Sequence, residues 1–318
     1  MFINIYNMYL KNRHEYIYSI KEDNNNDDIS SIMGLSDEEL DNITIDVFEL
    51  MSEKVMQVAF GYANSLIITG GSGLGKTHTV KESLNTSRTN YKLVKGDITT
   101  SGLYQLLLNN HDKLIVFDDC DSVLTEVDPN ILKAALDSYA EREVSRQISS
   151  HFRTEGMTMK DIMANYLGKV SMAENKDLFN PKNKGKLPQT FIFTGRVIFI
   201  SNLKLSEVDK NLITRATATI DVDLTHQQVL ERLNKVMSNM KKNVPEKMKN
   251  EVLKLVDYLT MNFETRNPLN IRTVSNAIDT RVSNDKRYKV INGKKFPLWQ
   301  IMIKEDLVGK KAKRRPKD

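Results

Sequence analysis

The sequence predicts an α/β fold in which a parallel five-stranded sheet, flanked by helices, is followed by a small all-helical domain. Three observations lead to this fold class. Short apolar runs alternate with helical patterns up to residue 223, a glycine-rich loop joins the first apolar run to a helix, and from residue 225 onward the pattern is helical. Regular alternation of strands and helices implies right-handed crossovers and a mostly parallel sheet covered by helices.

Composition is that of an ordinary globular protein. The chain has 318 residues, of which 40% are hydrophobic and 27% charged. Apolar runs such as 114–117 and 197–200 are far shorter than the roughly 20 residues of a membrane-spanning helix, and residues 1–10 lack the pattern of a secretory leader. A single cysteine, Cys120, excludes an internal disulfide, so we expect a packed thiol and a cytoplasmic protein, in the host cytoplasm if the source is viral.

Helices and strands are predicted in turn along residues 1–223. Residues 1–42 form an N-terminal extension with a helix expected over 2–21, and 43–223 form the α/β domain. Apolar residues recur at spacings of three and four over 43–62, which predicts an amphipathic helix before the sheet. Strands are expected at 65–69, 91–94, 113–118, 196–201 and 217–222. Helices are expected at 78–84, 101–109 and 130–148, the last with Tyr139 facing inward.

The segment 149–190 interrupts this alternation. A loop this long inside a domain is usually functional or disordered. We expect a helix over 157–167 and a hairpin whose return strand is 189–194. The tip of that hairpin carries three lysines, Lys182, Lys184 and Lys186. Contact with an anionic polymer and a solvated surface excursion both remain open for this segment.

The C-terminal part is expected to contain a lid-like helical domain over 224–285 and an extension over 286–318. The helices are expected at 225–242, 245–263 and 269–283. The extension ends in residues 310–318, whose net charge of +5 equals the formal net charge of the whole chain. Against the one acidic residue, Asp318, this segment contains six basic residues: Lys310, Lys311, Lys313, Arg314, Arg315 and Lys317. Such a tail either binds DNA or RNA phosphates or is a solvated end, and both interpretations stay open.

The glycine-rich loop carries the strongest functional signal. Its residues fit the pattern G-x-x-x-x-G-K-[ST] of a triphosphate-binding P-loop: Gly70, Gly71, Ser72, Gly73, Leu74, Gly75, Lys76 and Thr77. Backbone N–H groups of the loop and the helix N-terminus attract phosphate. Lys76 is therefore predicted to reach the β- and γ-phosphates of ATP, and Thr77 to hold Mg²⁺. The next residue, His78, is included in the predicted nucleotide site.

Two carboxylates follow the third apolar run. Asp118 is predicted to hold Mg²⁺, and Asp119 to orient and polarise the attacking water. Asp121 is the nearby alternative to Asp119.

With these motifs in order, the chain resembles the AAA+ ATPases over about 45–285. The resemblance implies a sensor-1 role for Asn202 after the fourth strand, an arginine finger at Arg215 before the fifth, and a sensor-2 role for Arg272 in the third lid helix. It also implies a ring or partial ring in which the finger completes a neighbour's site. The alternative for each is structural: a strand-end cap for Asn202, a surface ion pair for Arg215 and an exposed helical arginine for Arg272.

One residue departs from the family pattern. Asp119 stands where the family usually has glutamate, so its carboxylate lies one methylene further from the water. The richness in Asn, Ile and Lys and the single-module layout resemble AAA+ proteins of bacteriophages.

The leading hypothesis is therefore an oligomeric, Mg²⁺-dependent ATP hydrolase that remodels or moves a macromolecule, more in keeping with nucleic-acid metabolism than with protein unfolding. A nucleotide-gated interaction protein with little hydrolysis is a second interpretation, supported by Asp119. A small-molecule kinase is a third and leaves Asn202 and Arg272 without a role. We expect no membrane partner.

Overall fold

The computed structural model describes residues 36, 45–125, 127–139, 141–145, 190–310 and 313–315. The helices expected over 2–21 and 157–167, and the three lysines expected at the hairpin tip, lie outside these residues.

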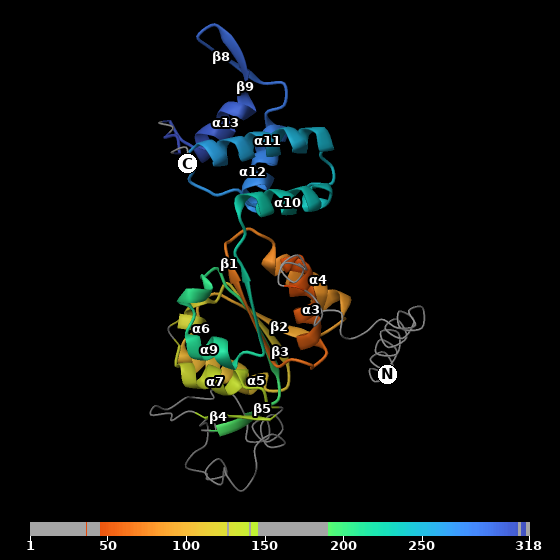
Figure 1. The fold of residues 1–318 in the computed structure, drawn as a ribbon, viewed down its shortest axis with the longest axis vertical. Helices are drawn as coiled ribbons and strands as arrows, with labels where there is room; N and C mark the ends of the chain where they lie inside the picture. Colours follow the sequence, from red (N-terminus) through yellow and green to blue (C-terminus); the bar gives the residue numbers. More distant parts are fainter. Residues whose placement is uncertain are drawn as a thin grey trace, which may run out of the picture. The chain divides into compact units, whose positions relative to one another are not determined.

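A five-stranded parallel sheet forms the centre of the first part, in the order β2-β3-β6-β1-β7 (Figure 1). The strands are β1 (Ser65–Gly70), β2 (Tyr91–Lys95), β3 (Leu114–Asp118), β6 (Arg196–Ile200) and β7 (Ala218–Val222). Every neighbouring pair is parallel. The predicted fold class and the five predicted strands are confirmed. β1 and β3 are buried along their whole lengths, as expected for strands with helices on both faces.

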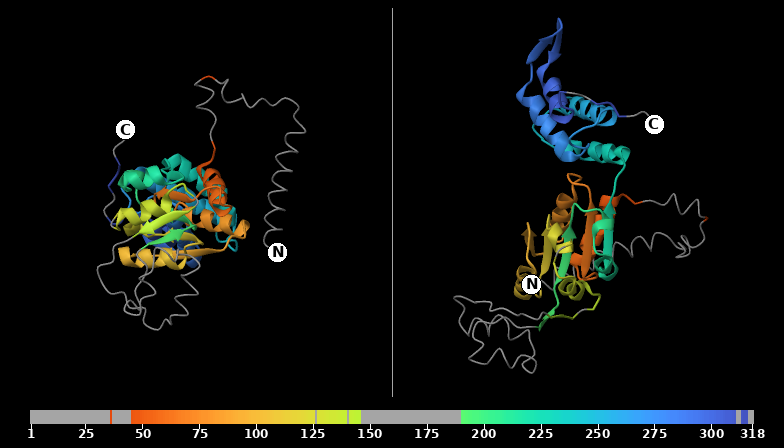
Figure 2. Two further views of the ribbon diagram at one scale, coloured as in Figure 1. Left: turned by 90° about the horizontal axis from the view of Figure 1, so that it is seen from below. Right: turned by 90° about the vertical axis from the view of Figure 1, so that its left-hand side faces the viewer.

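Helices cover both faces of this sheet (Figures 1 and 2). One hydrophobic cluster joins Leu66 and Ile68 of β1 to the helices α3 (Val47–Ala59) and α4 (Lys76–Thr86). The other joins Ile67, between those two residues, to the helices of the opposite face. Those helices are α5 (Thr100–Asn109), α6 (Asp121–Thr125), α7 (Pro129–Leu136) and α9 (Lys210–Arg215). Alternate strand residues therefore serve opposite cores, as the twofold repeat of a strand requires.

The helix predicted over 130–148 is wrong in its second half. α7 ends at Leu136, Tyr139 is 72% exposed, and β4 (Arg142–Ser145) follows. Burial alternates along β4, a strand pattern that a search for helical spacing misses. β4 pairs antiparallel with β5 (Thr190–Phe193), so the expected return strand is confirmed and its partner is β4. This short ladder brackets residues 146–189.

A buried arginine fastens the ladder to the rest of the domain. The Arg142 guanidinium donates to the carbonyls of Phe193 (3.2 Å), Ala135 (2.9 Å) and Gly195. It also lies 4.9 Å from the centroid of the Phe193 ring. Burial lowers the pKa of Arg142 to about 10. The cation is thus held mainly by neutral acceptors from three segments, and it ties β4 to α7 and β5.

The second part is helical, as predicted, and contains more than the three expected helices. α10 (His226–Val236), α11 (Glu246–Asn262) and α12 (Ile271–Ser283) correspond to the expected three. A hairpin of β8 (Tyr288–Ile291) and β9 (Lys294–Pro297) and a further helix, α13 (Leu298–Leu307), come after them. Trp299, Ile303 and Leu307 of α13 enter the same core as α11 and α12, so the helical part continues through Leu307. The 3-10 turns η4 (Leu205–Glu207) and η5 (Met237–Asn239) complete the described elements.

Part of the basic tail is attached to the helical part. The N–H of Glu264 donates to the Lys313 carbonyl at 2.9 Å, and the N–H of Arg315 donates to the Asn262 carbonyl at 3.1 Å. Arg314 forms a β-bridge with Phe263. The backbone of 313–315 therefore runs beside the end of α11.

One expectation from composition is met, and it concerns the single cysteine. Cys120 is buried, and burial raises the pKa of its thiol to about 11, so it is a packed, protonated residue. Across the described ranges, no helix combines the length and apolar character needed to cross a membrane.

We predict that Arg142→Ala lowers the free energy of unfolding by about 2–4 kcal/mol, because three buried carbonyls lose their donor. Urea unfolding followed by circular dichroism measures the loss. Glu143→Ala, on the exposed face of the same strand, is the matched control and is expected to change stability by less than about 0.5 kcal/mol. Equal stability of the two variants would contradict the anchoring role of Arg142.

Candidate nucleotide-binding site

The glycine-rich loop lies between β1 and α4, at the carboxyl end of the sheet. Gly70 has a φ of 121° and Gly73 a φ of 75°, both in the region that favours glycine. A side chain on Gly70 would collide with the carbonyl of Val222, and one on Gly73 would lie 2.8 Å from the Asn270 side chain. These two positions therefore require glycine on grounds of both conformation and space.

Lys76 is the first residue of α4, and its side chain folds back into the loop. Its Nζ donates to the carbonyls of Gly70 (2.6 Å) and Gly71 (2.7 Å) and to Asn202 Oδ1 (3.2 Å). The residue is 5% exposed. Burial lowers its pKa to about 8, against the opposing effect of Asp119 and other nearby carboxylates. A phosphate oxygen is a stronger acceptor than these carbonyls, so the ammonium is placed to exchange them for phosphate.

The two predicted magnesium ligands are in contact. Thr77 Oγ1 donates to Asp118 Oδ1 at 2.7 Å, and the Asp118 side chain is fully buried. The other carboxylate oxygen of Asp118 lies 2.8 Å from Lys95 Nζ. A hydroxyl and a carboxylate are the oxygen donors that Mg²⁺ prefers, so these residues fit that ion.

Lys95 was not expected at the site. It is the last residue of β2 and lies directly opposite Asp118 of β3 in the parallel pairing. The hydrogen bond with Asp118 raises the pKa of Lys95. Only the knowledge that β2 is the neighbour of β3 would have revealed this ion pair from the sequence.

Asn202 joins Lys76 to Asp119. Its amide oxygen accepts from Lys76 Nζ, and its Nδ2 donates to Asp119 Oδ1 at 2.8 Å. Asp119 is exposed and has a φ of 58°, while its N–H donates to the Ile200 carbonyl at the end of β6. The structure therefore brings three predicted catalytic residues into one hydrogen-bonded chain.

Asp121 has a different partner from Asp119. Its Oδ1 accepts from Ser201 Oγ at 2.6 Å and from the N–H of Asn202 at 3.3 Å. It thus fixes the end of β6 and the backbone of Asn202. This contact makes Asp121 a positioning residue.

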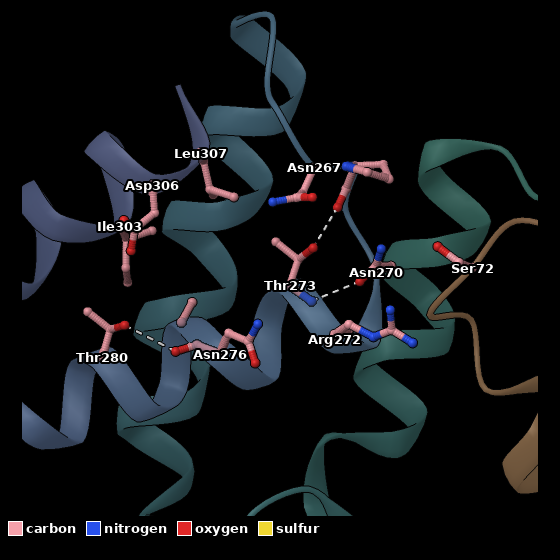
Figure 3. Close-up of a pocket in the computed structure, with 12 residues that line it drawn as sticks. Ser72, Asn267, Asn270, Arg272, Thr273, Asn276, Thr280, Ile303, Asp306 and Leu307 are labelled. Atoms are coloured by element: carbon pink, nitrogen blue, oxygen red, sulfur yellow. Dashed lines mark hydrogen bonds between the residues drawn. The ribbon is translucent and has the colours of Figure 1, made fainter. Parts of the chain in front are cut away.

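The helical part contacts the loop through the start of α12. The N–H of Ile271 donates to the Gly73 carbonyl at 2.9 Å, and Asn270 caps the helix by accepting from the N–H of Thr273 at 2.8 Å. Arg272 is exposed and, with Ser72, lines a pocket of about 300 Å³ (Figure 3). The predicted lid arginine therefore lies at the loop.

A second arginine of the helical part was missed. Arg232 of α10 lies over the Phe48 ring, 3.9 Å from its centroid, and its Nη2 is 4.0 Å from where a side chain on Gly75 would begin. The helical spacing of α10, whose buried residues are Val229 and Leu233, gives no sign that Arg232 approaches the loop.

Two predicted site residues, Arg215 and His78, have partners outside the group formed by Lys76, Thr77, Asp118, Asp119 and Asn202. Arg215, at the end of α9, places its Nη1 2.7 Å from Asp137 Oδ2, and its side chain is 48% exposed. His78 is exposed on α4, with its Nδ1 3.5 Å from Glu82 Oε2. The roles predicted for these two residues stay predictions.

Comparisons with known proteins give distant matches. No family model matches the chain. A protein of Enterobacteria phage T4, described as an uncharacterised 36.7 kDa protein in the nrdC-mobD intergenic region, is 28% identical over an alignment of 223 residues that covers 67% of each chain.

Three solved structures are similar to this chain over most of its length. The RuvB Holliday junction branch migration motor of Thermotoga maritima is 12% identical, with a TM-score of 0.44 over 85% of this chain and 69% of that one. The HORMA:CdnC:Trip13 complex of E. coli MS115-1 includes a chain 11% identical, with a TM-score of 0.37 over 83% and 88%. The replication initiator DnaA bound to AMPPCP and single-stranded DNA is 13% identical, with a TM-score of 0.34 over 82% and 67%.

We predict that ATP affinity depends on pH through Lys76. With a pKa of about 8 in the free protein, the Lys76 side chain is a charged ammonium below pH 8 and a neutral amine above it. Above pH 8 the amine must therefore take up a proton when ATP binds. Bound phosphate raises this pKa, so affinity falls as pH rises through 8, by up to about tenfold per unit. Calorimetry at pH 8.5 in two buffers of different ionisation enthalpy measures the proton uptake.

The matched control is Lys81→Gln in the same helix, which should leave proton uptake unchanged. Binding without proton uptake in the unaltered protein would contradict the low pKa of Lys76.

Proposed function

We propose that this chain is an ATPase of the AAA+ type, in which 43–223 bind ATP and 224–285 act as a lid. The observation that carries the proposal is the hydrogen-bonded chain from Lys76 through Asn202 to Asp119, set beside the Thr77–Asp118 pair. Each of these residues leaves the carboxyl end of β1, β3 or β6, three adjacent strands of the sheet. Ligands of open α/β sheets bind at this end.

In this proposal the loop holds the triphosphate of ATP. Backbone N–H groups between Gly71 and Thr77 surround the β-phosphate, and Lys76 moves from its carbonyl partners to the phosphate oxygens. Thr77 and Asp118 would hold Mg²⁺, which neutralises phosphate charge when bound.

Asp119 is proposed to orient the attacking water and to accept its proton. The shorter side chain does not isolate it, because its carboxylate already reaches the Asn202 amide at 2.8 Å. Asn202 in turn contacts Lys76. The water, the Asn202 amide and the Lys76 ammonium would therefore lie together on one side of the γ-phosphate. Groups fixed in this way stabilise the charge of the transition state without rearranging.

Arg215 is proposed to act on a neighbouring subunit in a ring or partial ring. It is half exposed, and the pair with Asp137 holds it at the surface. Asp137 also forms the C-cap of α7, so the ion pair joins the end of α9 to the end of α7. Hydrolysis would then depend on assembly.

The macromolecule acted on is proposed to be DNA or RNA, contacted through the basic tail from Lys310 to Lys317 and the lysines at 182–186. A protein substrate is the alternative. We place the protein in the cytoplasm, that of the host if a phage encodes it.

A nucleotide-gated interaction protein with little hydrolysis is the second candidate function. The observation in its favour is Asp119, which is exposed and shorter than the glutamate usual in the family. In that case ATP would organise the assembly, and turnover would be marginal. Hydrolysis rates separate the two functions.

We predict that Lys76→Ala removes ATP binding and hydrolysis together, whereas Asp119→Asn keeps binding and lowers kcat by about 100-fold or more. Phosphate release and equilibrium binding of a labelled ATP analogue measure the two quantities. Lys81→Ala in α4 is the control. If the unaltered protein hydrolyses ATP no faster than Lys76→Ala, with and without DNA or RNA, the hydrolase function is lost and the second candidate replaces it.

We predict that Arg215→Ala abolishes hydrolysis and leaves ATP binding within about twofold, because the arginine acts on a neighbour. Asp137→Ala removes the same ion pair but leaves the arginine, so it should retain hydrolysis. A mixture of Arg215→Ala and Lys76→Ala chains should regain part of the activity, since each supplies what the other lacks. Equal losses in Arg215→Ala and Asp137→Ala would make Arg215 a structural residue.

A further inference from the structure

The β8–β9 hairpin is a feature of the helical part to which the proposed ATPase assigns no task. It connects α12 to α13 and projects away from the helices (Figures 1 and 2). Asn292 and Gly293 form its turn with φ values of 49° and 75°, the pattern of a tight two-residue hairpin turn. The N–H of Leu298 donates to the Arg287 carbonyl at 2.8 Å and closes its base.

Both faces of this ribbon are exposed. All of its strand residues are exposed except Pro297, which is half-buried. The register places Tyr288, Val290 and Lys295 on one face, and Lys289, Ile291, Lys294 and Phe296 on the other. Each face thus presents one aromatic ring, one β-branched residue and at least one lysine. A two-stranded ribbon gains little from exposing such residues unless they meet a partner.

The charge of the hairpin has one sign. Residues 286–297 contain no acidic residue and five basic ones: Lys286, Arg287, Lys289, Lys294 and Lys295. Lys295 Nζ lies 4.3 Å from the centroid of the Tyr288 ring, so cation and ring share one surface. This combination suits a partner that offers negative charge and flat rings together.

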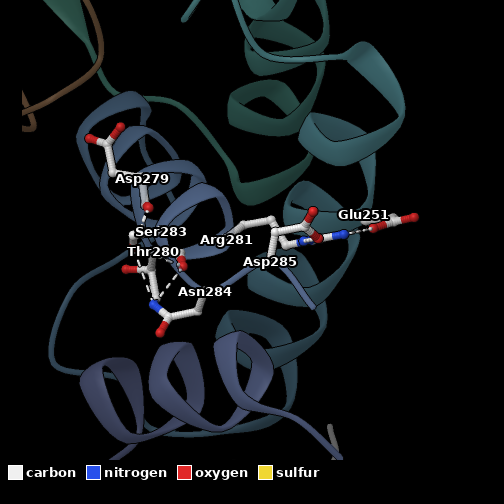
Figure 4. Close-up of polar contacts among 7 residues, drawn as sticks. All are labelled: Glu251, Asp279, Thr280, Arg281, Ser283, Asn284 and Asp285. Atoms are coloured by element: carbon white, nitrogen blue, oxygen red, sulfur yellow. Dashed lines mark hydrogen bonds and ion pairs between the residues drawn. The ribbon is translucent and has the colours of Figure 1, made fainter. Parts of the chain in front are cut away.

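Two carboxylates at the base of the hairpin pair with Arg281. Its Nη1 lies 2.6 Å from Asp285, and its Nη2 lies 3.3 Å from Glu251 of α11 (Figure 4). The same guanidinium lies 4.9 Å from the centroid of the Trp299 ring in α13. Arg281 therefore anchors the hairpin base to three helices and compensates the two carboxylates, which leaves the lysines of the ribbon to act on a partner.

A pocket of about 400 Å³ continues this surface at the base of the hairpin. Its lining includes Lys254, Lys286, Arg287, Tyr288 and Trp299, together with Glu251 and Asp285, whose carboxylates both pair with Arg281. The cationic surface thus extends from the ribbon into a concave site.

We propose that the β8–β9 hairpin binds a nucleic-acid strand with unpaired bases. Lysines along a groove or ribbon neutralise phosphates, and exposed aromatic rings stack on bases of any sequence. An acidic protein partner fits less well, because the core of a protein interface is depleted of charged residues, and here each face of the ribbon carries at least one lysine beside its apolar residues. The proposal deepens the proposed function by naming a binding surface, and it does not depend on ATP hydrolysis.

Binding of a fluorescein-labelled oligothymidylate to the full-length chain, without nucleotide, tests the proposal. The triple variant Lys289→Gln, Lys294→Gln, Lys295→Gln should bind at least about tenfold more weakly near 0.1 M salt. The slope of log affinity against log salt should fall by about two, since each lost phosphate contact on a single strand contributes about 0.7. The control Lys92→Gln, Lys242→Gln, Lys247→Gln removes three exposed lysines elsewhere and should stay within twofold.

A second variant separates stacking from charge. Phe296→Ala should weaken binding about tenfold and leave the salt slope unchanged, and duplex DNA should show little of this loss. Fluorescence of Trp299, the one tryptophan of the chain, follows binding at the hairpin base.

Three results would overturn the proposal: unchanged affinity in the lysine variant, equal losses in the lysine control, or competition by polyglutamate as effective as that of the oligonucleotide. Lys76→Ala should bind the strand like the unaltered chain, so failure of hydrolysis and failure of strand binding are distinguished.

Discussion

Burial of a cation at the carboxyl end of the sheet is the constraint on which the site depends. Lys76 is held by the carbonyls of Gly70 and Gly71 and by Asn202, and among the described residues no carboxylate contacts its ammonium directly. This position exists because β1 lies beside β6 and β6 beside β3, so that the loop, Asn202 and Asp119 meet. The strand order therefore determines which side chains meet at the site.

The three carboxylates at and just after the end of β3, those of Asp118, Asp119 and Asp121, lie in different environments because the backbone turns between them. Asp118 is buried at the end of β3 and contacts Thr77 and Lys95, whereas Asp119 turns into the left-handed region and faces solvent. Asp121, in the first turn of α6, reaches back to Ser201 and Asn202. The exposed acid is the one available to a water, and the other two hold the structures around it. Removal of charge at each position should therefore have distinct effects.

Features set by neighbouring residues in sequence were predictable, and the ion pairs set by neighbouring segments of the fold were not. The loop, the buried strands and Asp118 follow from local patterns. Lys95 at Asp118 and Asp137 at Arg215 are pairs between segments that only the fold brings together. β4 was mistaken for helix because its burial depends on Arg142, a charged residue that an apolar pattern does not count. α13 was missed for a different reason, since it follows a hairpin whose exposed apolar residues give no core signal.

The helix α12 connects the glycine-rich loop to the base of the β8–β9 hairpin. The N-terminus of α12 donates to the Gly73 carbonyl of the loop through Ile271, and Arg281 in its last turn fixes the base of the hairpin. A helix of this length behaves as a rigid element of about 20 Å. If phosphate entering the loop displaces Ile271, α12 would carry that displacement to the hairpin base, and the proposed strand binding at the hairpin would act on the loop in return. Coupling between two sites is reciprocal, so both directions must have the same magnitude.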